Sequence, residues 1–458
     1  MHSETQYNPL LNQLKELIEL DRLLFFQKTA ENYHQRALKL QELGLDFLAI
    51  VDFKTYLSLE KKENLKDFDY QYVAKLSINA FMQQYQAEKD TPYYAWMIYL
   101  VSANQKLLLD GISSKILTNI SGSLALVGLF NLSLTCCDLA IQYIQEPNQK
   151  NLTLLNKGLL LNLLGDFKQG LPLYEKRLAA NKHFKGDIYA PHKKWNGEDI
   201  GDQILLIRRE QGIGDNIQFV RYAIMLKQQG INVVVCNKKE IDDFLRFNLA
   251  KYNIPCSNEL RDKTAHYTIW MMSLPYIFKQ NANNIPFTTA YLQAKEENVD
   301  KWRKQLPHTY KRKIGFVFQG NKEVHKNKTR GIDLSIFKAL FKFDAEFICL
   351  QKELDQDEKQ QLDCFENVFY PNQLNSFFDT SAIIAECDLV ISVDTSVAHL
   401  AAAMGKSTWI LVNYVPDFRW GLHSDKSIWY KSVKLFRQDL SYTWQPVIDQ
   451  VYRELERI

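Results

Sequence analysis

The chain has 458 residues and a formal net charge of +3, and 46% of its residues are hydrophobic. This length exceeds what one hydrophobic core usually supports, so we expect two to four domains. The 56 basic residues nearly balance the 53 acidic ones. That balance gives no reason to expect a protein that binds nucleic acid or a membrane surface.

The N-terminal stretch and the cysteines favour a cytoplasmic protein. Residues 1–26 are acidic and amphipathic and show no signal-peptide pattern. The most apolar window, Leu124–Leu134, is too short to span a bilayer, so we expect no transmembrane segment. The seven cysteines show no CxxC pair and no metal-ligand spacing. We therefore expect reduced thiols and no structural zinc site.

Helical periodicity dominates the chain up to about residue 185. Two segments, Leu126–Ile141 and Leu163–Leu178, match at an offset of 37 residues and align Gly128 with Gly165. The shared pattern of helix, Gly-x-aromatic turn and helix resembles the tetratricopeptide repeat, and a generic helical bundle is the alternative. We predict an α-helical domain of this type over residues 1–185.

After residue 185 strands and helices alternate. The pattern predicts strands at Gln203–Arg209 and Ile231–Asn237 and helices at Gly214–Gly230 and Lys239–Leu249. An order of this kind implies a parallel sheet. We predict an N-terminal Rossmann-like domain, on the acceptor side, over residues 186–306.

A second unit of the same kind begins with a strand at Lys313–Asn321. The elements predicted after it are helix Asp333–Phe343, strand Ala345–Gln351, helix Thr380–Cys387, strand Leu389–Val393, helix Ser396–Gly405 and strand Ser407–Val412. We predict a C-terminal Rossmann-like domain, on the donor side, over residues 307–458. The predicted fold class is α/β, with two such domains facing a cleft at the carboxyl ends of their strands, where ligands bind.

The first candidate loop, EQGIGDN at Glu210–Asn216, joins a predicted strand to a predicted helix. Gly212 and Gly214 allow a tight turn. Asp215, at the helix start, has two interpretations: a helix N-cap, or a carboxylate that accepts a proton from an acceptor hydroxyl. The loop lacks the third glycine of a dinucleotide fingerprint, which argues against a dehydrogenase.

A basic loop, QGNKEVHKNKTRGI at Gln319–Ile332, follows the first strand of the second unit. Its cations are Lys322, His325, Lys326, Lys328 and Arg330, and Glu323 is its one acidic residue. Such a loop at the carboxyl end of a strand suits a diphosphate, because cations neutralise the charge on a leaving phosphate. A solvated surface loop is the alternative.

The third candidate, Asp394–Thr395–Ser396, lies between an apolar strand and a small, apolar helix. Free N–H groups and the dipole at a helix N-terminus attract anions, so Thr395 and Ser396 suit both a cap and an anion site. Asp394 would repel a phosphate, and we expect it to bind backbone donors and shape the loop. His399, on the helix, is more often part of a core than a ligand.

With these loops in place, the chain resembles bacterial tetratricopeptide-repeat glycosyltransferases whose catalytic half is similar to the ADP-heptose transferases. The resemblance runs from about Leu163 to the C-terminus. It depends on the blocks WNGEDIGDQILLIRREQGIGDNIQFVRYA, GFVFQGNKEVHKNKTRGIDL, FFDTSAIIAECDLVISVDTSVAHLAAAMGK and PDFRWGLHSDKSIWYKSVKLFRQ. It implies the GT-B fold and an inverting, metal-independent sugar transfer, with the donor nucleotide held mainly by the C-terminal domain.

The resemblance also implies roles for residues at matching positions. Asp215 corresponds to the candidate base and Arg330 to the leaving-group cation. The implied donor-binding residues are Gly214, Gly320, Asn321, His325, Lys328, Gln351, Lys352, Asp394, Thr395, Ser396, His399, Asp417, Arg419 and Trp420. Glu210, Gln211 and Gln218 fall on the acceptor side. We expect no cofactor and no metal, since the chain shows no credible DxD motif.

One block departs from the family pattern. Many relatives carry H-x-N-D-R-x-R-S where this chain has HKNKTRGI, in which the stretch from the histidine to the last arginine is one residue shorter and lacks the aspartate. Which cation meets the phosphate therefore stays open, and the change could signal an altered choice of donor.

The sequence thus predicts a cytoplasmic hexosyl- or heptosyltransferase that uses an ADP-, UDP- or GDP-linked sugar. The helical region would dock a protein acceptor. One alternative is a glycosyltransferase acting on a glycan or a lipopolysaccharide core. Another is a non-catalytic repeat scaffold with a degenerate transferase domain, an idea motivated by the altered basic loop.

Overall fold

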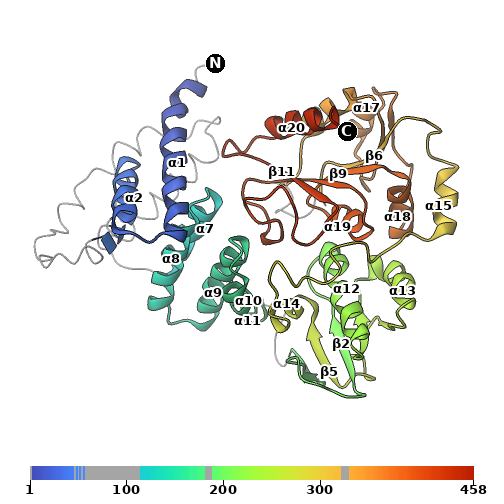
Figure 1. Cartoon of the computed structure of the whole chain (residues 1–458), viewed down its shortest axis with the longest axis horizontal. Helices are drawn as coiled ribbons and strands as arrows, with labels where there is room; N and C mark the ends of the chain where they lie inside the picture. Colours follow the sequence, from blue (N-terminus) through green and yellow to red (C-terminus); the bar gives the residue numbers. More distant parts are fainter. Residues whose placement is uncertain are drawn as a thin grey trace, which may run out of the picture. The chain divides into compact units, whose positions relative to one another are not determined.

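The computed structural model describes residues 3–45, 48–49, 51–52, 55–56, 114–180, 188–320 and 330–458. The chain divides into two compact units: residues 1–182 with 439–442, and residues 183–438 with 443–458. Figure 1 shows the elements of both, coloured along the chain. Asn321, His325 and Lys328, which are predicted site residues, lie outside the described residues.

The first unit is built from helices in its described part. They are α1 (Ser3–Phe26), α2 (Ala30–Glu42), α7 (Ser114–Leu126), α8 (Phe130–Tyr143), α9 (Pro147–Leu163), α10 (Phe167–Tyr174) and α11 (Arg177–Ala180). Helices α7 and α8 form one hairpin, and α9 and α10 form another. The two aligned glycines occupy equivalent turns, with φ of +86° at Gly128 and +87° at Gly165. Only glycine adopts this conformation readily, which accounts for the repeat seen in the sequence.

A buried ion cluster holds the start of the first unit together. Arg36 of α2 donates to both oxygens of Asp52, at 2.6 and 2.7 Å, and to Asp21 of α1 at 2.6 Å. Asp21 in turn accepts from the backbone N–H groups of Asn131 and Leu132, in the first turn of α8. One carboxylate of α1 therefore pairs with α2 and satisfies helix-end donors of α8.

Gly158 allows α9 and α10 to approach closely, and it offers a test of this packing. A Cβ at Gly158 would lie 2.8 Å from Leu173 Cβ and from the Tyr174 nitrogen. We expect Gly158→Ala to destabilise the protein by about 1–3 kcal/mol through overpacking, although alanine favours helices. The matched control is Gly122→Ala in α7, where nothing lies within 4 Å. That change should instead stabilise by about 0.5–1 kcal/mol. Urea unfolding of both variants measures the contrast, and equal shifts would contradict the packing.

In its described residues the second unit contains two sheets, and all of their strand pairs are parallel. The first has the order β1 (Lys193–Lys194), β5 (Tyr267–Trp270), β2 (Ile204–Arg208), β3 (Asn232–Cys236), β4 (Cys256–Ser257). Its helices include η2 (Lys239–Ile241), η3 (Met271–Ser273), α12 (Ile213–Gln228), α13 (Asp242–Ala250) and α14 (Leu274–Ile277).

The second sheet has six strands. Their order is β11 (Val433–Arg437), β10 (Thr408–Val412), β9 (Leu389–Val393), β6 (Lys313–Val317), β7 (Glu346–Cys349), β8 (Val368–Phe369). The accompanying helices are α15 (Glu296–Arg303), α16 (Leu334–Phe337), η5 (Lys338–Lys342), α17 (Gln356–Leu362), α18 (Phe377–Glu386), α19 (Ser396–Ala403), η6 (Phe418–Trp420) and α20 (Gln445–Leu455). Strands β9 and β10 are buried at every position, as expected for parallel strands covered on both sides.

The predicted α/β class, with two parallel sheets after a helical region, is confirmed. The prediction at Leu389–Val393 coincides with β9. Two predicted helices are less regular: Asp333–Phe343 is a single α turn followed by η5, and Lys239–Leu249 begins with η2. The domain boundaries at 185 and 306 stay predictions. Among the described helices, none has the length and apolar content needed to cross a bilayer.

Candidate functional site

Asp215 lies at the start of α12, the helix that follows β2. It is the third residue of the helix, and its Oδ2 accepts from the backbone N–H of Gly212 at 2.6 Å. Gly212 is the N-cap residue, so the interpretation of Asp215 itself as the N-cap is wrong. The carboxylate reaches back to a helix-end donor, which fixes its position at the edge of the sheet.

Thr395 caps α19, which follows the carboxyl end of β9. Its side chain accepts from the Ala398 N–H at 3.5 Å and lies 3.0 Å from the hydroxyl of Ser392. Ser396 is the first residue of the helix. The predicted cap is confirmed, and the helix end carries the N–H donors and the dipole that attract anions.

Helix α12, which follows β2 of the first sheet, packs against α19, which follows β9 of the second sheet (Figure 1). Gly214 allows this approach, since a Cβ there would lie 2.9 Å from Cδ2 of His399. His399 is buried, and its Nδ1 lies 3.0 Å from the hydroxyl of Tyr430. Its ring also stacks on that of Trp420 at a centroid distance of 5.2 Å.

Arg419 joins the two sheets electrostatically. Its NH2 pairs with Oδ1 of Asp215, and its NH1 pairs with Oδ1 of Asp417 at 2.7 Å. Beside this group, Arg330 lies 3.2 Å from Asp394. The side chains of Asp215 and Arg419 are only 13% and 9% exposed, so water screens their attraction weakly.

The described contacts of Asp394 are with side chains. Its Oδ2 pairs with Arg330, and its Oδ1 lies 3.9 Å from Nε2 of His399. Backbone donors, which the sequence predicts for this carboxylate, are not among these contacts of the described residues, and they stay a prediction. Asp394 nevertheless links two segments, because its pair with Arg330 ties the carboxyl end of β9 to the last cation of the basic loop.

Burial dominates the acid–base properties of Asp215, Asp394 and His399. It raises the pKa of Asp215 above its ordinary value, although Arg419 and the Gly212 N–H act to lower that pKa. It likewise raises the pKa of Asp394 against the influence of Arg330. Burial and the nearby Arg419 guanidinium lower the pKa of His399 to about 3. His399 is therefore a neutral imidazole at pH 7.

The acceptor-side predictions fall around α12 in different environments. Glu210 is buried and accepts from the Met272 N–H at 2.9 Å. Gln211 adopts φ of +55° in the turn, a conformation that is uncommon for residues other than glycine. Gln218 is fully buried inside α12. Glu210 therefore ties the loop before α12 to η3 instead of lying at the surface of the site.

The remaining described donor-side predictions lie beyond β6 and β7. Gly320 follows β6, and Gln351 and Lys352 follow β7. Oε1 of Gln351 accepts from the Gln319 N–H at 3.2 Å, so it links the ends of these two strands. The described contacts do not join Gln351 or Lys352 to the cluster around Asp215.

Sequence reasoning missed a buried arginine, Arg221, between the two sheets. Arg221 of α12 donates to the carbonyl of Trp429 at 2.8 Å and to the hydroxyl of Tyr291 at 3.0 Å. The ring of Tyr430 lies 4.6 Å from its guanidinium carbon. Arg221 thus fixes α12 against the segment that also contacts His399. The only signal was a charged residue in the middle of an otherwise apolar stretch of helix, QFVRYAI.

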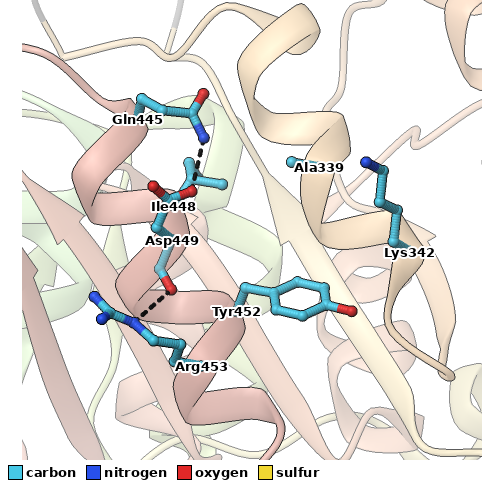
Figure 2. A pocket seen from close by; sticks show the side chains of 7 residues that line it. All are labelled: Ala339, Lys342, Gln445, Ile448, Asp449, Tyr452 and Arg453. Carbon is cyan, nitrogen blue, oxygen red and sulfur yellow. Dashed lines mark hydrogen bonds between the residues drawn. The ribbon is translucent and has the colours of Figure 1, made fainter.

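A shallow groove of about 490 Å³ lies elsewhere on the second unit, between η5 and α20 (Figure 2). Two of its polar side chains bond within α20: Gln445 to the Asp449 carboxylate at 2.8 Å, and Arg453 to the Asp449 carbonyl at 3.3 Å. None of the predicted site residues lines this groove. We therefore place the candidate site at the cluster around Arg419.

Comparison with known proteins gives a family match across part of the chain. Residues 367–428 match the model of glycosyltransferase family 9 (heptosyltransferase). This segment runs from the start of β8 past η6 and includes Asp394, Asp417 and Arg419. The match confirms the predicted resemblance to ADP-heptose-transferase-like proteins for these residues.

Protein FlbA of Caulobacter vibrioides is 24% identical to this chain over 363 residues. The alignment covers 71% of this chain and 58% of FlbA, so the chain spans less than two thirds of that relative.

Three glycosyltransferases are among the solved structures that match this chain. A glycosyl transferase family 9 protein from Veillonella parvula matches with TM-score 0.41 and 9% identity, over 57% of this chain and 99% of that one. The heptosyltransferase WaaC from E. coli, in complex with ADP-2-deoxy-2-fluoro heptose, matches with TM-score 0.36 and 12% identity, over 56% and 99%. A mutant O-GlcNAc transferase from Thermobaculum terrenum matches with TM-score 0.29 and 10% identity, over 98% and 93%.

Proposed function

We propose that this protein is an inverting, metal-independent glycosyltransferase that moves a sugar from a nucleotide-sugar donor to a hydroxyl acceptor. One observation carries the proposal. The ion pair between Asp215 and Arg419 brings a buried carboxylate of one sheet to the loop of the other sheet that matches glycosyltransferase family 9. This transfer needs a base for the acceptor hydroxyl and an anion-binding helix end for the leaving diphosphate, and the two sheets each contribute one of them.

In the proposed reaction the acceptor oxygen attacks the anomeric carbon of the donor from the side opposite the diphosphate. A bond forms between that carbon and the acceptor oxygen while the bond to the phosphate oxygen breaks, which inverts the configuration. Asp215 takes the proton of the acceptor hydroxyl. Arg330 and the N-terminus of α19 stabilise the charge on the departing nucleoside diphosphate.

For the acceptor, we propose a protein that docks on the helical first unit. Helical hairpin repeats commonly offer extended surfaces for peptides. The second candidate is a glycan or lipopolysaccharide-core acceptor, and the heptosyltransferase description of the matched family favours it. Transfer to a purified glycan but to no polypeptide would decide for the second candidate.

A donor screen tests the proposed function. We expect one of the ADP-, UDP- or GDP-linked sugars to raise the melting temperature of the protein and to be turned over with release of the nucleoside diphosphate. No stabilisation by any of them, together with no binding of ADP, UDP or GDP in calorimetry, would favour the non-catalytic scaffold instead.

Metal independence makes a separate prediction. Turnover of the donor identified in the screen should be unchanged after dialysis against EDTA, because cationic side chains and a helix end carry the leaving-group charge in this proposal. The measurement is the initial rate with EDTA, without EDTA and with added Mg²⁺ or Mn²⁺. Loss of activity in EDTA that Mg²⁺ or Mn²⁺ restores would contradict the prediction.

A further inference from the structure

We infer that Arg419 is a latch on the base: Asp215 and the donor diphosphate compete for its guanidinium, so donor binding releases the Asp215 carboxylate for proton transfer. This inference rests on the proposed function and adds an order of events to it. It assigns to Arg419 a coupling role, beyond the donor contact implied by its position in the family.

Both oxygens of Asp215 are engaged in this structure. Oδ2 accepts from the Gly212 N–H at 2.6 Å, and Oδ1 pairs with NH2 of Arg419. The cap bond belongs to the helix, so the oxygen available to an acceptor hydroxyl is the one that Arg419 holds. A carboxylate in a charge-assisted bond with a buried guanidinium is a weak base, since protonation would break that bond.

Arg419 has a second ion-pair partner, Asp417, which would keep the side chain in the site when its NH2 leaves Asp215. Its NH1 pairs with Asp417 at 2.7 Å, and Asp417 also accepts from the Arg419 backbone N–H at 3.1 Å. Both residues lie in the same short loop after β10. The guanidinium can therefore exchange the partner of NH2 while NH1 stays on Asp417.

The loop that carries Arg419 lies against α19, whose N-terminus is the proposed diphosphate site. The ring of Trp420, the next residue, stacks on His399 of α19, and Nε2 of His399 lies 3.9 Å from Asp394. Because His399 is neutral, Arg330 and Arg419 supply the cationic charge in the described part of this cluster. They face three carboxylates, those of Asp215, Asp394 and Asp417. A diphosphate entering there would draw NH2 of Arg419 away from Asp215.

Release would also strengthen the base. Burial raises the pKa of Asp215, and Arg419 is the foremost influence that lowers it. When Arg419 moves to the diphosphate, the pKa of Asp215 rises further, so the released carboxylate becomes a stronger base. At a pH between the free and bound values, diphosphate binding would therefore be accompanied by uptake of a proton.

A double-mutant cycle tests the competition with ADP, UDP or GDP, whichever binds the intact protein. Asp215→Asn should tighten binding by about tenfold, because Arg419 no longer has to leave a carboxylate. In the Arg419→Gln background, Asp215→Asn should leave affinity nearly unchanged. An equal gain in affinity in both backgrounds would mean that Asp215 acts on the diphosphate only by long-range repulsion. That result would overturn the latch.

Proton uptake gives an independent readout by calorimetry in buffers of different ionisation enthalpy. The wild type should take up more protons on binding than Asp215→Asn or Arg419→Gln, and equal uptake in all three would refute the latch. The matched control is Arg303→Gln, which removes an arginine from the exposed pairs with Asp300 and Glu386 and should change neither affinity nor uptake. If none of the nucleoside diphosphates binds, the proposed function itself fails. If one binds without these couplings, only the latch fails.

Discussion

Replacing Asp215 by asparagine is expected to lower the turnover number of sugar transfer by about 10²–10⁴-fold, the usual contribution of a general base. The amide has no basic oxygen that can take the acceptor proton. Its carbonyl oxygen can still accept from the Gly212 N–H, so the start of α12 should keep its cap. The loss should therefore appear in the turnover number rather than in folding.

The measurement is release of the nucleoside diphosphate at saturating donor and acceptor, with a thermal melt of each variant. Asp379→Asn is a matched control, because Asp379 is the third residue of α18 and accepts from the backbone N–H of its N-cap, Ser376, at 3.2 Å. That change removes a carboxylate from the same kind of cap on another helix and should leave turnover intact. Full activity in Asp215→Asn would exclude Asp215 as the base.

The sequence predicted the scaffold of the site best where long apolar runs meet short polar loops. The buried strand Leu389–Val393 and the small, apolar helix after it were found at nearly their observed bounds. Because parallel strands bring their carboxyl ends to one edge, the same reasoning placed Asp215 and Thr395 at helix starts on the edges of the two sheets. It could not distinguish an aspartate at the N-cap from one at the third helical position that accepts from the N-cap N–H. Both arrangements place an aspartate beside a glycine.

Short strands were predicted poorly. Strand β5 has four residues, and β11 carries Lys434 and Arg437 among its five. Such stretches offer too few positions to show a period of two. Strand β11 lies at the edge of its sheet, where charged side chains reach solvent more easily.

The contacts that join the two sheets lay beyond sequence reasoning. Arg221 bonds to a carbonyl 208 positions away, and Arg419 pairs with a carboxylate 204 positions away. Local patterns carry no information about such partners. The family resemblance pointed to Arg419, but its pairing with Asp215 required the fold. The assignments of Asn321, His325 and Lys328 stay predictions.

Arg36→Met should destabilise the helical unit by about 3–5 kcal/mol, the usual cost of removing one partner from a buried ion pair. Arg36 is fully buried, and Asp21 and Asp52 are 2% and 1% exposed. Methionine fills much of the same space but leaves two carboxylates without their cation. The measurement is the urea dependence of unfolding, with hydrogen exchange at α8 amides as a local readout, because Asp21 also bonds to the start of that helix.

The loss in Arg36→Met should also grow with pH, and the direction follows from the buried carboxyl groups. Burial raises the pKa of Asp21 and Asp52, and Arg36 is the largest influence that lowers it. Without Arg36 both folded-state pKa values rise further above the unfolded ones. A group with a raised folded pKa favours the fold below its unfolded pKa and loses that contribution as pH rises toward the folded value. The deficit should therefore be larger at pH 8 than at pH 5.

An exposed ion pair of the same unit shows why burial, rather than charge pairing as such, sets this expectation. Lys157 and Asp138 pair with side chains 22% and 53% exposed, so water screens them and solvates either partner left alone. Lys157→Met should cost less than about 1 kcal/mol and show no growth with pH. If Arg36→Met behaved like Lys157→Met at both pH values, the cluster would not be holding α1, α2 and α8 together. A large, pH-dependent difference between the two variants instead follows directly from leaving Asp21 and Asp52 buried without a counter-charge.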